Sequence, residues 1–168
     1  NNVETWVAAS GIVINGAEKF SAIGNKKSAG TKLVCLDSFF KNPGVYEIDM
    51  GTPMRKVFNE IGGGYKEEIK AFQIGGPLGG VVPMAEIENL NLDFQEFTAK
   101  GFMLGHASVV SIPKNFSMTE YIHHLFEFSA EESCGKCFPG RLGSYRGKEM
   151  FDQVKKKTAK IPLKLLNE

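Results

Sequence analysis

A strand pattern changes into a helix pattern within residues 45–64, whose sequence is VYEIDMGTPMRKVFNEIGGG. In the first part of this stretch, apolar side chains at Tyr46, Ile48 and Met50 alternate with charged ones. A period of two is typical of a β-strand that has one buried and one solvated face. The sequence therefore predicts a strand from Val45 to Met50.

The second part of the stretch has the pattern of a helix. Thr52 suits the N-terminal cap, Pro53 the first helical position and Gly62 the C-terminal stop. Apolar residues at helical spacing form one stripe, which consists of Met54, Val57, Phe58 and Ile61. We expect this stripe to face the core and Phe58 to be buried.

Further strands are expected on both sides. The run Thr31–Leu36 is rich in strand-forming residues, and the Asn42-Pro43-Gly44 turn joins it to the strand just described as a hairpin. Residues 69–74 are predicted to form a third strand, and residues 108–112 a late strand that completes the sheet. Strand, strand, helix, strand is the order of a β-grasp, or ubiquitin-like, fold. We therefore predict the α+β class, with a β-grasp domain over residues 30–113.

Different patterns lie before and after this predicted domain. Residues 1–29 are expected to be a connector. After the sheet, Ser117 and Glu120 have the spacing of a capping box, and a helical stripe follows them. Residues 148–166 are also predicted to be helical, with an interruption at a proline. Residues 114–168 should therefore form a helical segment.

The first helix of this segment leads into Glu-Ser-Cys-Gly-Lys-Cys-Phe-Pro-Gly-Arg, residues 132–141. Cys134 and Cys137 form a C-x-x-C, a spacing that lets two thiolates reach one metal. A four-cysteine cluster loop would continue with a third cysteine three residues later, where this chain has Gly140. A thioredoxin-like pair would follow a strand, whereas a helix precedes this one. Taken alone, the pair remains ambiguous between a metal site, a redox pair and neither.

Two other motifs favour structural interpretations. The glycine-rich run Gly75-Gly76-Pro77-Leu78-Gly79-Gly80 lacks the Gly-Lys-Ser/Thr ending of a phosphate loop, so we expect a tight turn that needs positive φ and close backbone approach. His123 and His124 are adjacent on a predicted helix and point in different directions. We expect them on the helix surface and not in a shared metal site.

Composition excludes several classes of protein. The chain has 168 residues, of which 42% are hydrophobic and 23% charged, values typical of a globular protein. A formal net charge of +1 argues against a dedicated nucleic-acid surface, and no apolar run approaches the roughly 18 residues of a membrane span. Three cysteines, an odd number, favour a reducing, cytoplasmic setting. The sequence begins without a methionine or a signal peptide, so we expect a segment of a longer protein.

Short motifs occur along the chain in a fixed order: Asn1-Asn2-Val3-Glu4-Thr5, Asn15-Gly16-Ala17-Glu18, Gly30-Thr31-Lys32, Pro43-Gly44-Val45-Tyr46-Glu47, Gly51-Thr52-Pro53, Gly75-Gly76-Pro77 and Glu132-Ser133-Cys134-Gly135-Lys136-Cys137. With these motifs the chain resembles the C-terminal part of the NADH-binding flavoprotein subunit of respiratory complex I. It is equally similar to the diaphorase subunits of NAD(P)-reducing hydrogenases and formate dehydrogenases. The resemblance covers nearly the whole chain.

The resemblance implies a domain order for the full-length protein. A domain that binds FMN and NADH through a glycine-rich motif, absent from this chain, precedes a soluble-ligand-binding β-grasp domain and a helical domain that holds a [4Fe–4S] cluster. By resemblance, Asn1, Asn2 and Thr5 match positions that touch FMN, at one rim of the flavin pocket. Cys134 and Cys137 match the first two cluster ligands.

Two departures from the family pattern concern the cluster. The third ligand position is Gly140, which cannot coordinate iron, and the chain ends before any fourth cysteine. Cys35 lies on a predicted strand and is no substitute. Three explanations stay open: another ligand is recruited, the position has been altered, or this homologue has lost the cluster.

The resemblance implies a function for the parent protein. It would be an NAD(P)H-oxidising flavoprotein subunit, an NADH dehydrogenase or hydrogenase component, that passes electrons from FMN towards a [4Fe–4S] cluster. This chain alone is expected to be inactive and to bind neither FMN tightly nor a cluster. The alternative is a small-ligand-binding and subunit-docking module with a degenerate cluster site.

The resemblance also implies a setting. The expected partners are other subunits of a multisubunit oxidoreductase, including a thioredoxin-like [2Fe–2S] subunit. Neither nucleic acid nor direct membrane insertion is expected. The expected location is the cytoplasm, or the cytoplasmic face of the membrane through the complex.

Overall fold

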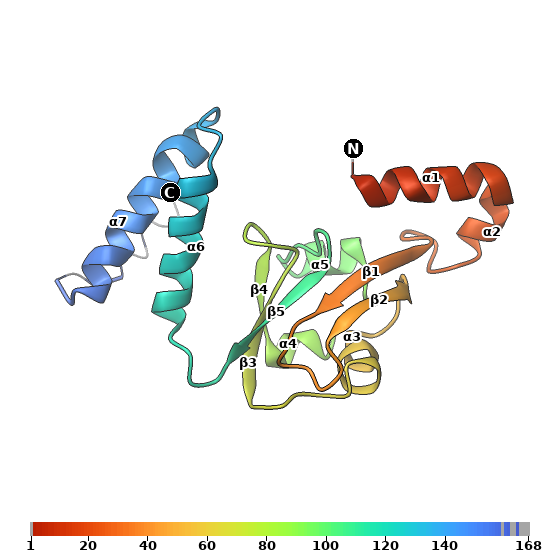
Figure 1. Ribbon diagram of the computed structural model, residues 1–168, viewed down its shortest axis with the longest axis horizontal. Helices are drawn as coiled ribbons and strands as arrows, with labels where there is room; N and C mark the ends of the chain where they lie inside the picture. The colour runs from red at the N-terminus through yellow and green to blue at the C-terminus, as the bar shows by residue number, and fades with distance from the viewer. Residues whose placement is uncertain (1, 159, 162–163, 165–168) are drawn as a thin grey trace. The chain divides into compact units, whose positions relative to one another are not determined.

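The computed structural model describes residues 2–158, 160, 161 and 164. The chain divides into two compact units, Asn1–Lys114 and Asn115–Glu168. The first unit holds a sheet with helices, and the second is helical (Figure 1). The predicted α+β class is therefore confirmed.

A mixed sheet of five strands organises the first unit. The strands are β1 (Thr31–Leu36), β2 (Gly44–Asp49), β3 (Ile69–Ile74), β4 (Gly80–Pro83) and β5 (Ser108–Pro113). Their order in space is β2-β1-β5-β3-β4. β1 and β5 run parallel to each other in the middle of the sheet, and the other neighbours are antiparallel.

Four of these strands agree with the sequence prediction to within one residue at each end. β4 was not predicted, because it is only four residues long and follows a glycine-rich turn. Gly75 and Gly76 adopt φ of +88° and +93°, and a Cβ at Gly79 would lie 1.9 Å from the carbonyl oxygen of Ile74. The predicted tight turn is thus confirmed, since only glycine tolerates these positions. The turn returns the chain alongside β3 to form β4.

The predicted helix after β2 is present but begins differently. It consists of α3 (Met54–Lys56), which continues into a π-helical turn, η1 (Val57–Ile61). The predicted cap at Thr52 is wrong: Pro53 stands at the cap position, and no side chain caps the helix. The backbone of Thr52 instead accepts a hydrogen bond from the N–H of Leu92 at 2.8 Å.

The apolar stripe of this helix enters the core of the unit, where Met54, Val57 and Phe58 are buried. Phe58 packs against Phe72 of β3 with ring centroids 4.7 Å apart, and against Phe40 at 5.1 Å. Aromatic pairs at such separations add to the burial of apolar area. The stripe therefore attaches the helix to the sheet.

Between β4 and β5 the chain forms two short helices, α4 (Met84–Ile87) and α5 (Phe94–Ala99). Asp93 caps α5, because its Oδ1 accepts hydrogen bonds from the N–H groups of Gln95 and Glu96 at 2.8 and 2.9 Å. Ile87 and Phe97 are buried. Both helices thus add apolar side chains to the same core.

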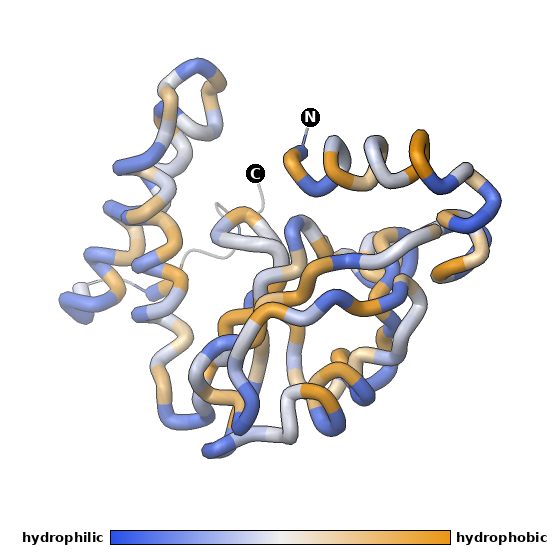
Figure 2. The backbone as a smooth tube through the Cα atoms, turned by 45° about the vertical axis from the view of Figure 1, so that its right-hand side comes forward, coloured by the Kyte–Doolittle hydropathy of each residue, from blue (hydrophilic) through white to orange (hydrophobic). Residues whose placement is uncertain are grey.

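The first 29 residues, expected to be a connector, contain two helices, α1 (Val3–Asn15) and α2 (Ala17–Ser21). None of the residues of α1 is buried, and large apolar side chains such as Trp6 and Val13 are exposed. Figure 2 shows hydrophobic residues recurring along this helix. No side of this helix is buried in the core, so its apolar residues need not form a single stripe. The helix was therefore not predicted from an apolar stripe.

The second unit contains α6 (Met118–Glu132), a π-helical turn η2 (Pro139–Gly143) and α7 (Ser144–Lys155). Ser117 caps α6 as predicted, since its Oγ accepts the N–H of Glu120 at 3.4 Å. The boundaries predicted for the last helix are wrong, because α7 begins four residues earlier than expected and ends at Lys155. The predicted C-terminal end at residue 166 lies outside the described residues. Among the helices of the described part, none is both long and apolar enough to cross a membrane.

Truncation of Phe58 tests the packing of the first unit. Phe58→Ala should lower the free energy of unfolding by about 3–5 kcal/mol, because the side chain is 1% exposed and its loss leaves a cavity. Denaturant unfolding measures the change. Leu78→Ala is the matched control, because Leu78 is 81% exposed and its truncation should cost less than about 0.5 kcal/mol. Equal effects of the two substitutions would contradict this packing.

Candidate functional site

The cysteine loop begins where α6 ends. Ser133 follows the last residue of the helix in an extended conformation, with φ −63° and ψ 127°. Gly135 then adopts φ +70° and donates its backbone N–H to Ser133 Oγ at 3.2 Å. This positive φ favours glycine, and it turns the chain back between Cys134 and Cys137.

Both thiols of the loop are free and exposed. Cys137 stands just before η2, and its carbonyl oxygen accepts the N–H of Arg141 at 2.9 Å. Single π-helical turns within helices are often found at functional sites. Here the turn holds residue 140 next to Cys137.

Gly140 faces the thiol of Cys137. A Cβ built on Gly140 would lie 3.2 Å from Cys137 Sγ and 2.8 Å from Ser133 Oγ. The backbone of Gly140 is helical, so an L-residue is compatible with its conformation. A side chain there would require Ser133 Oγ, which accepts the N–H of Gly135, and Cys137 Sγ to shift, and it would point towards the existing thiol.

The donor set of this loop does not fit a protein-ligated [4Fe–4S] cluster. Such a cluster is usually held by four cysteine thiolates, and the loop supplies two, from Cys134 and Cys137. Within the described residues, no group of three or more His, Cys, Asp or Glu side chains could hold a metal ion. Cys35 lies on β1 of the other unit. Gly140 is thus the first point of disagreement with a cluster loop.

Close helix packing supports the loop. A Cβ on Gly147 of α7 would lie 2.2 Å from Phe126 Cδ1 of α6, so the glycine allows the two helices to approach. Phe126 also stacks on Phe151 with ring centroids 5.7 Å apart. The hydroxyl of Ser144 donates to the carbonyl of Gly140 at 3.1 Å. These contacts hold both ends of the loop on one small core.

A polar contact between the same helices involves His123. The expectation that His123 lies on the helix surface is wrong: its side chain is buried, and Nε2 lies 2.7 Å from Asp152 Oδ1 of α7. Lys148 adds a longer contact of 3.5 Å to Asp152 Oδ2. The hydrogen bond with His123 and the charge of Lys148 lower the pKa of Asp152. The interaction was not foreseen, because helix spacing alone does not show which face meets α7.

The residues expected to touch FMN lie at the start of α1. Asn1 is outside the described residues. Asn2 is the N-cap of α1, and its Oδ1 accepts the N–H of Glu4 at 2.8 Å. Asn2 and Thr5 line a hollow of about 520 Å³ together with His106. The structure therefore brings these two polar residues to one place, in a different unit from the cysteine loop.

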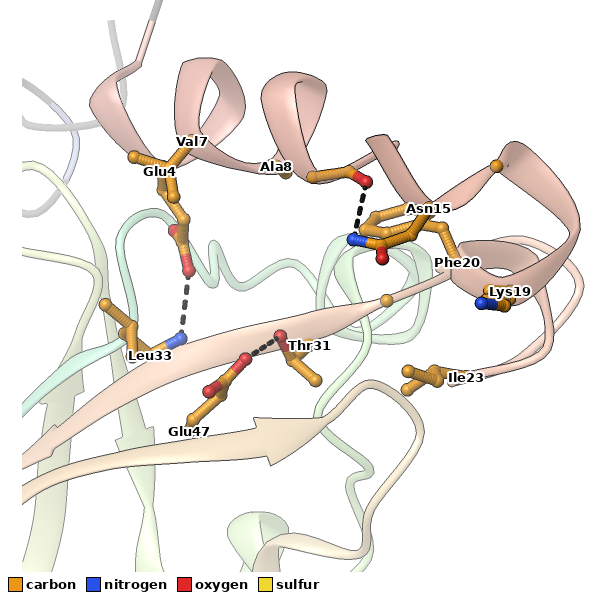
Figure 3. A pocket seen from close by; sticks show the side chains of 13 residues that line it. Glu4, Val7, Ala8, Asn15, Lys19, Phe20, Ile23, Thr31, Leu33 and Glu47 are labelled. Atoms are coloured by element: carbon orange, nitrogen blue, oxygen red, sulfur yellow. Dashed lines mark hydrogen bonds between the residues drawn. The ribbon is translucent and has the colours of Figure 1, made fainter. Parts of the chain in front are cut away.

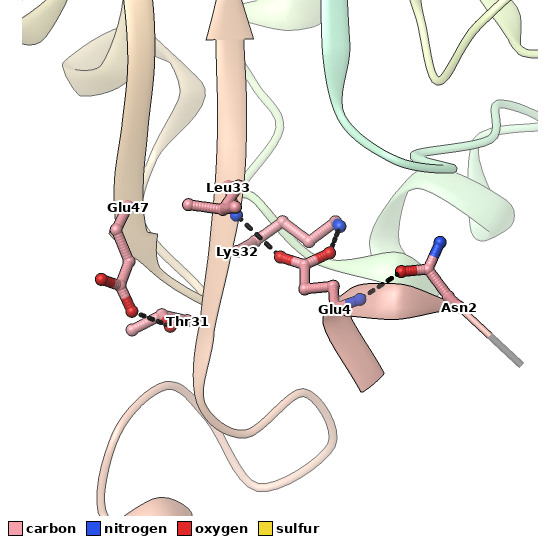
Figure 4. A network of polar contacts seen from close by, with 6 residues as sticks. All are labelled: Asn2, Glu4, Thr31, Lys32, Leu33 and Glu47. Atoms are coloured by element: carbon pink, nitrogen blue, oxygen red, sulfur yellow. Dashed lines mark hydrogen bonds and ion pairs between the residues drawn. The ribbon is translucent and has the colours of Figure 1, made fainter. Parts of the chain in front are cut away.

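Glu4 links this first helical turn to the sheet. Its Oε2 forms an ion pair with Lys32 Nζ, and its Oε1 accepts the backbone N–H of Leu33 at 2.9 Å (Figure 4). Glu4 and Lys32 both lie in motifs that carry the family resemblance, yet the sequence does not show that they meet. The only sequence signal for this contact was that Glu4 and Lys32 carry opposite charges, each within a short motif.

A second hollow, of about 540 Å³, lies between α1, α2 and the start of β1. Its lining is mostly apolar and includes Val7, Phe20, Ile23 and Leu33. Figure 3 shows Val7 of α1 and Leu33 of β1 at one end of this hollow, and Asn15, Phe20 and Lys19 at the other end. The space shows that α1 lies above β1 without filling the gap between them.

Comparisons with known proteins agree with the motifs. Residues 120–168 match the family described as the NADH-ubiquinone oxidoreductase-F iron-sulfur binding region. An F-type subunit of the NADH-quinone oxidoreductase of Rhizobium meliloti is 41% identical over 145 residues, which cover 85% of this chain and 34% of that protein. The chain is a homologue of these F-type subunits. The resemblance found in the sequence is thereby confirmed.

Hydrogenase subunits are among the relatives as well. The NADP-reducing hydrogenase subunit HndC of Solidesulfovibrio fructosivorans is 36% identical over 158 residues, 93% of this chain and 32% of that protein. The crystal structure of an NAD+-reducing [NiFe]-hydrogenase in the H2-reduced state matches 99% of this chain and 28% of its own, with a TM-score of 0.84 and 30% identity. This chain therefore spans about a third of the length of the two curated relatives.

Restoring a third thiol tests the loop. In the complete gene product, Gly140→Cys should raise the iron content, because the new side chain would point towards Cys137. Iron and sulfide assays and low-temperature EPR of the reduced protein measure the change. Gly143→Cys is the matched control, because a Cβ there would meet only Pro139, at 3.9 Å.

Two results would contradict that expectation. An equal gain of iron in the Gly143→Cys protein would show that the position of the thiol is irrelevant. Full cluster occupancy in the unaltered protein would show that another residue already serves as a ligand.

The contact between His123 and Asp152 predicts a pH dependence. Because the pKa of Asp152 is lowered in the folded state, its carboxylate stabilises the protein above the unfolded pKa of about 4, and the effect is lost as the pH falls through the folded value. Asp152→Asn should therefore lower Tm at neutral pH, and the difference from the unaltered protein should shrink below pH about 4.

Thermal melting followed by circular dichroism measures this difference. Glu149→Gln, which alters an exposed pair with Arg146, is the control and should change Tm little. A difference for Asp152→Asn that stays constant from neutral to acidic pH would refute the proposed origin of the stabilisation.

Proposed function

We propose that this chain is the C-terminal part of an NAD(P)H-oxidising flavoprotein subunit of a multisubunit oxidoreductase. The observation that carries the proposal is the match of 99% of the chain, at a TM-score of 0.84, to an NAD+-reducing hydrogenase. A match of this extent includes both α1, with the expected flavin residues, and the helices of the cysteine loop. The identity of 30% supports common descent as well as a common fold.

We also propose that the first unit is a soluble-ligand-binding β-grasp domain. The strand order β2-β1-β5-β3-β4, with the first and last strands parallel at the centre, supports this assignment. So does the position of α3 between β2 and β3 in the chain. The domain would dock partner subunits through its exposed surface.

In this proposal the start of α1 forms one rim of the flavin site. Asn2 uses its Oδ1 as the helix cap and retains an amide group that can donate, and Thr5 adds a hydroxyl. The first turn of a helix favours a phosphate group because its N–H groups and dipole attract anions. FMN, when bound, supplies hydride acceptance from NAD(P)H and the release of single electrons. These residues would hold its polar tail and do no chemistry themselves.

The cysteine loop has a more limited part in the proposal. In the parent family, electrons would pass from FMN towards a [4Fe–4S] cluster that the helical domain holds. Cys134 and Cys137 would be its first two ligands, but Gly140 leaves the donor set short. We therefore assign no electron-transfer step to this loop.

A second candidate function is a docking module with a degenerate cluster site. The specific observation in its favour is Gly140 next to exposed apolar side chains, Phe138, Leu142 and Tyr145. In this case the chain would join subunits without carrying electrons. Iron content and flavin content of the native assembly discriminate the two candidates.

The proposed partners are the other subunits of such an assembly, including a thioredoxin-like [2Fe–2S] subunit, and not nucleic acid. The proposed location is the cytoplasm or the cytoplasmic face of the membrane. Relatives named as subunits of quinone oxidoreductases and hydrogenases support the choice of partners. Co-purification of the assembly from its own host, with a tag on this chain, would identify them.

Flavin release tests the proposed function. The native assembly, purified from its host, should contain about one FMN per copy of this chain and oxidise NADH or NADPH with an artificial acceptor. Asn2→Ala and Thr5→Ala should each weaken FMN binding about tenfold, because each removes a hydrogen-bonding group. Flavin fluorescence after acid release, and titration of the flavin-depleted assembly, measure both quantities.

A matched control lies on the same helix. Ser10→Ala removes a hydroxyl that hydrogen-bonds within α1, to the carbonyl of Val7, and should leave flavin binding unchanged. A native assembly without flavin and without NAD(P)H oxidation would overturn the proposal and favour the docking candidate.

A further inference from the structure

Lys32 is an unusually buried charge. It lies on β1 and is only 6% exposed. A lysine at this depth is costly unless an opposite charge accompanies it. Its partner is Glu4 of α1, which lies 28 residues earlier in the chain. The pair therefore joins two segments whose association is not set by local sequence.

The carboxylate of Glu4 has a second partner in the backbone of β1. Its Oε1 accepts the N–H of Leu33, and its Oε2 contacts the ammonium of Lys32 (Figure 4). The pairing of β1 with β5 is at Cys35 and Leu36, which follow Leu33 in the strand. Glu4 thus supplies the acceptor for the backbone N–H of Leu33, in the part of β1 that precedes this pairing. We call these contacts of Glu4 with Lys32 and Leu33 the Glu4 clasp.

The clasp matters because α1 has little else to fix it. No residue of α1 is buried, and a hollow lies between the helix and β1. Burial raises the pKa of Glu4, but the hydrogen bonds from Lys32 and Leu33 and the charge of Lys32 outweigh it and lower the pKa overall. The carboxylate is therefore ionised at neutral pH, and the clasp is a charge-assisted contact.

Glu4 stands between the two expected flavin residues. The N–H of Glu4 is the group that Asn2 caps, and Thr5 is the next residue in the same turn. All three residues line the hollow that also contains Lys32 and His106. A shift of this turn by about 1 Å would move both flavin residues together. Misplacement of this size can strongly lower the rate of a reaction that depends on precise positioning.

We infer that Glu4 and Lys32 are positioning residues of the flavin rim: the clasp holds the first turn of α1 on β1 and so sets the place of Asn2 and Thr5. The inference rests on the proposed function for its flavin readout. We assign Lys32 a role through Glu4, because its ammonium is paired with that carboxylate and the residue is only 6% exposed. Neither residue is a catalytic residue.

Graded variants of the native assembly test the inference. Glu4→Ala removes both contacts of the clasp, whereas Glu4→Gln removes the charge and keeps an oxygen for the N–H of Leu33. Lys32→Met replaces the ammonium with an apolar end of similar length. FMN affinity should fall in the order unaltered protein, Glu4→Gln, Glu4→Ala, with a loss of about 10–100-fold for Glu4→Ala, by analogy with residues that orient the ligands of a metal site. Lys32→Arg, which retains the charge, should keep more affinity than Lys32→Met.

The control is an exposed ion pair of the same unit. Lys114 and Glu68 are 2.8 Å apart, and their side chains are largely exposed. Lys114→Met and Glu68→Gln should leave FMN affinity unchanged. Thermal melting of each variant shows whether the unit is still folded.

Hydrogen exchange provides a readout that does not depend on flavin. In Glu4→Ala and Lys32→Met, the backbone amides of α1 should exchange faster, while those of β3 should not change. This result, with lower FMN affinity, supports the inference. Unchanged α1 exchange and unchanged affinity would overturn it, as would faster exchange throughout the unit, which indicates general unfolding. An unaltered assembly without flavin would overturn the proposed function and the flavin rim with it, whereas the exchange experiment would still report separately on whether the clasp holds α1.

Discussion

The parallel pairing of β1 with β5 is the constraint on which the first unit depends. The first and last strands of the chain, β1 and β5, are neighbours in the sheet. The segment between them therefore forms the outer strands on both sides of this pair, with β2 beside β1 and with β3 and β4 beyond β5. Asp37, just after β1, reinforces the pairing, because its carboxylate accepts the N–H of Ser111 at 2.6 Å and its hydroxyl at 3.0 Å. A parallel pair needs a long crossover, which here contains β2, β3 and β4 and the helices α3 to α5. The apolar stripe of the helix after β2 fills the space that this path encloses.

Each unit presents its candidate functional residues through a small number of local contacts. In the first unit, the start of α1 is held to the sheet by a carboxylate that binds both a buried lysine and a strand N–H. In the second unit, the cysteine loop is held between two helices by stacked aromatic rings and by the contact of His123 with Asp152. Rigid elements that carry flexible termini or loops are a common way to position binding residues. The two sites therefore have separate structural supports.

The disagreement at Gly140 is local. The loop around it keeps the turn at Gly135, the π-helical turn and the hydroxyl of Ser144 on the carbonyl of residue 140. A Cβ at this position would point towards the thiol of Cys137. The loop thus has the C-x-x-C spacing of a cluster loop but no coordinating side chain at the third position. Similarity to a family predicts the shape of such a loop, but its donor atoms decide what it can hold.

The sequence by itself determined the α+β class, four of the strands, the cap of α6 and the C-x-x-C with its missing third position. These features depend on residue periodicity and on spacing over a few positions, which are local properties. The tertiary structure decided the order of the strands, the short strand β4, the burial of Lys32 and His123, and the direction that a side chain at residue 140 would take. Each of these depends on which distant segment lies alongside, so Lys32 could be understood only once Glu4 was seen beside it. Long-range pairing is the information that a local pattern does not contain.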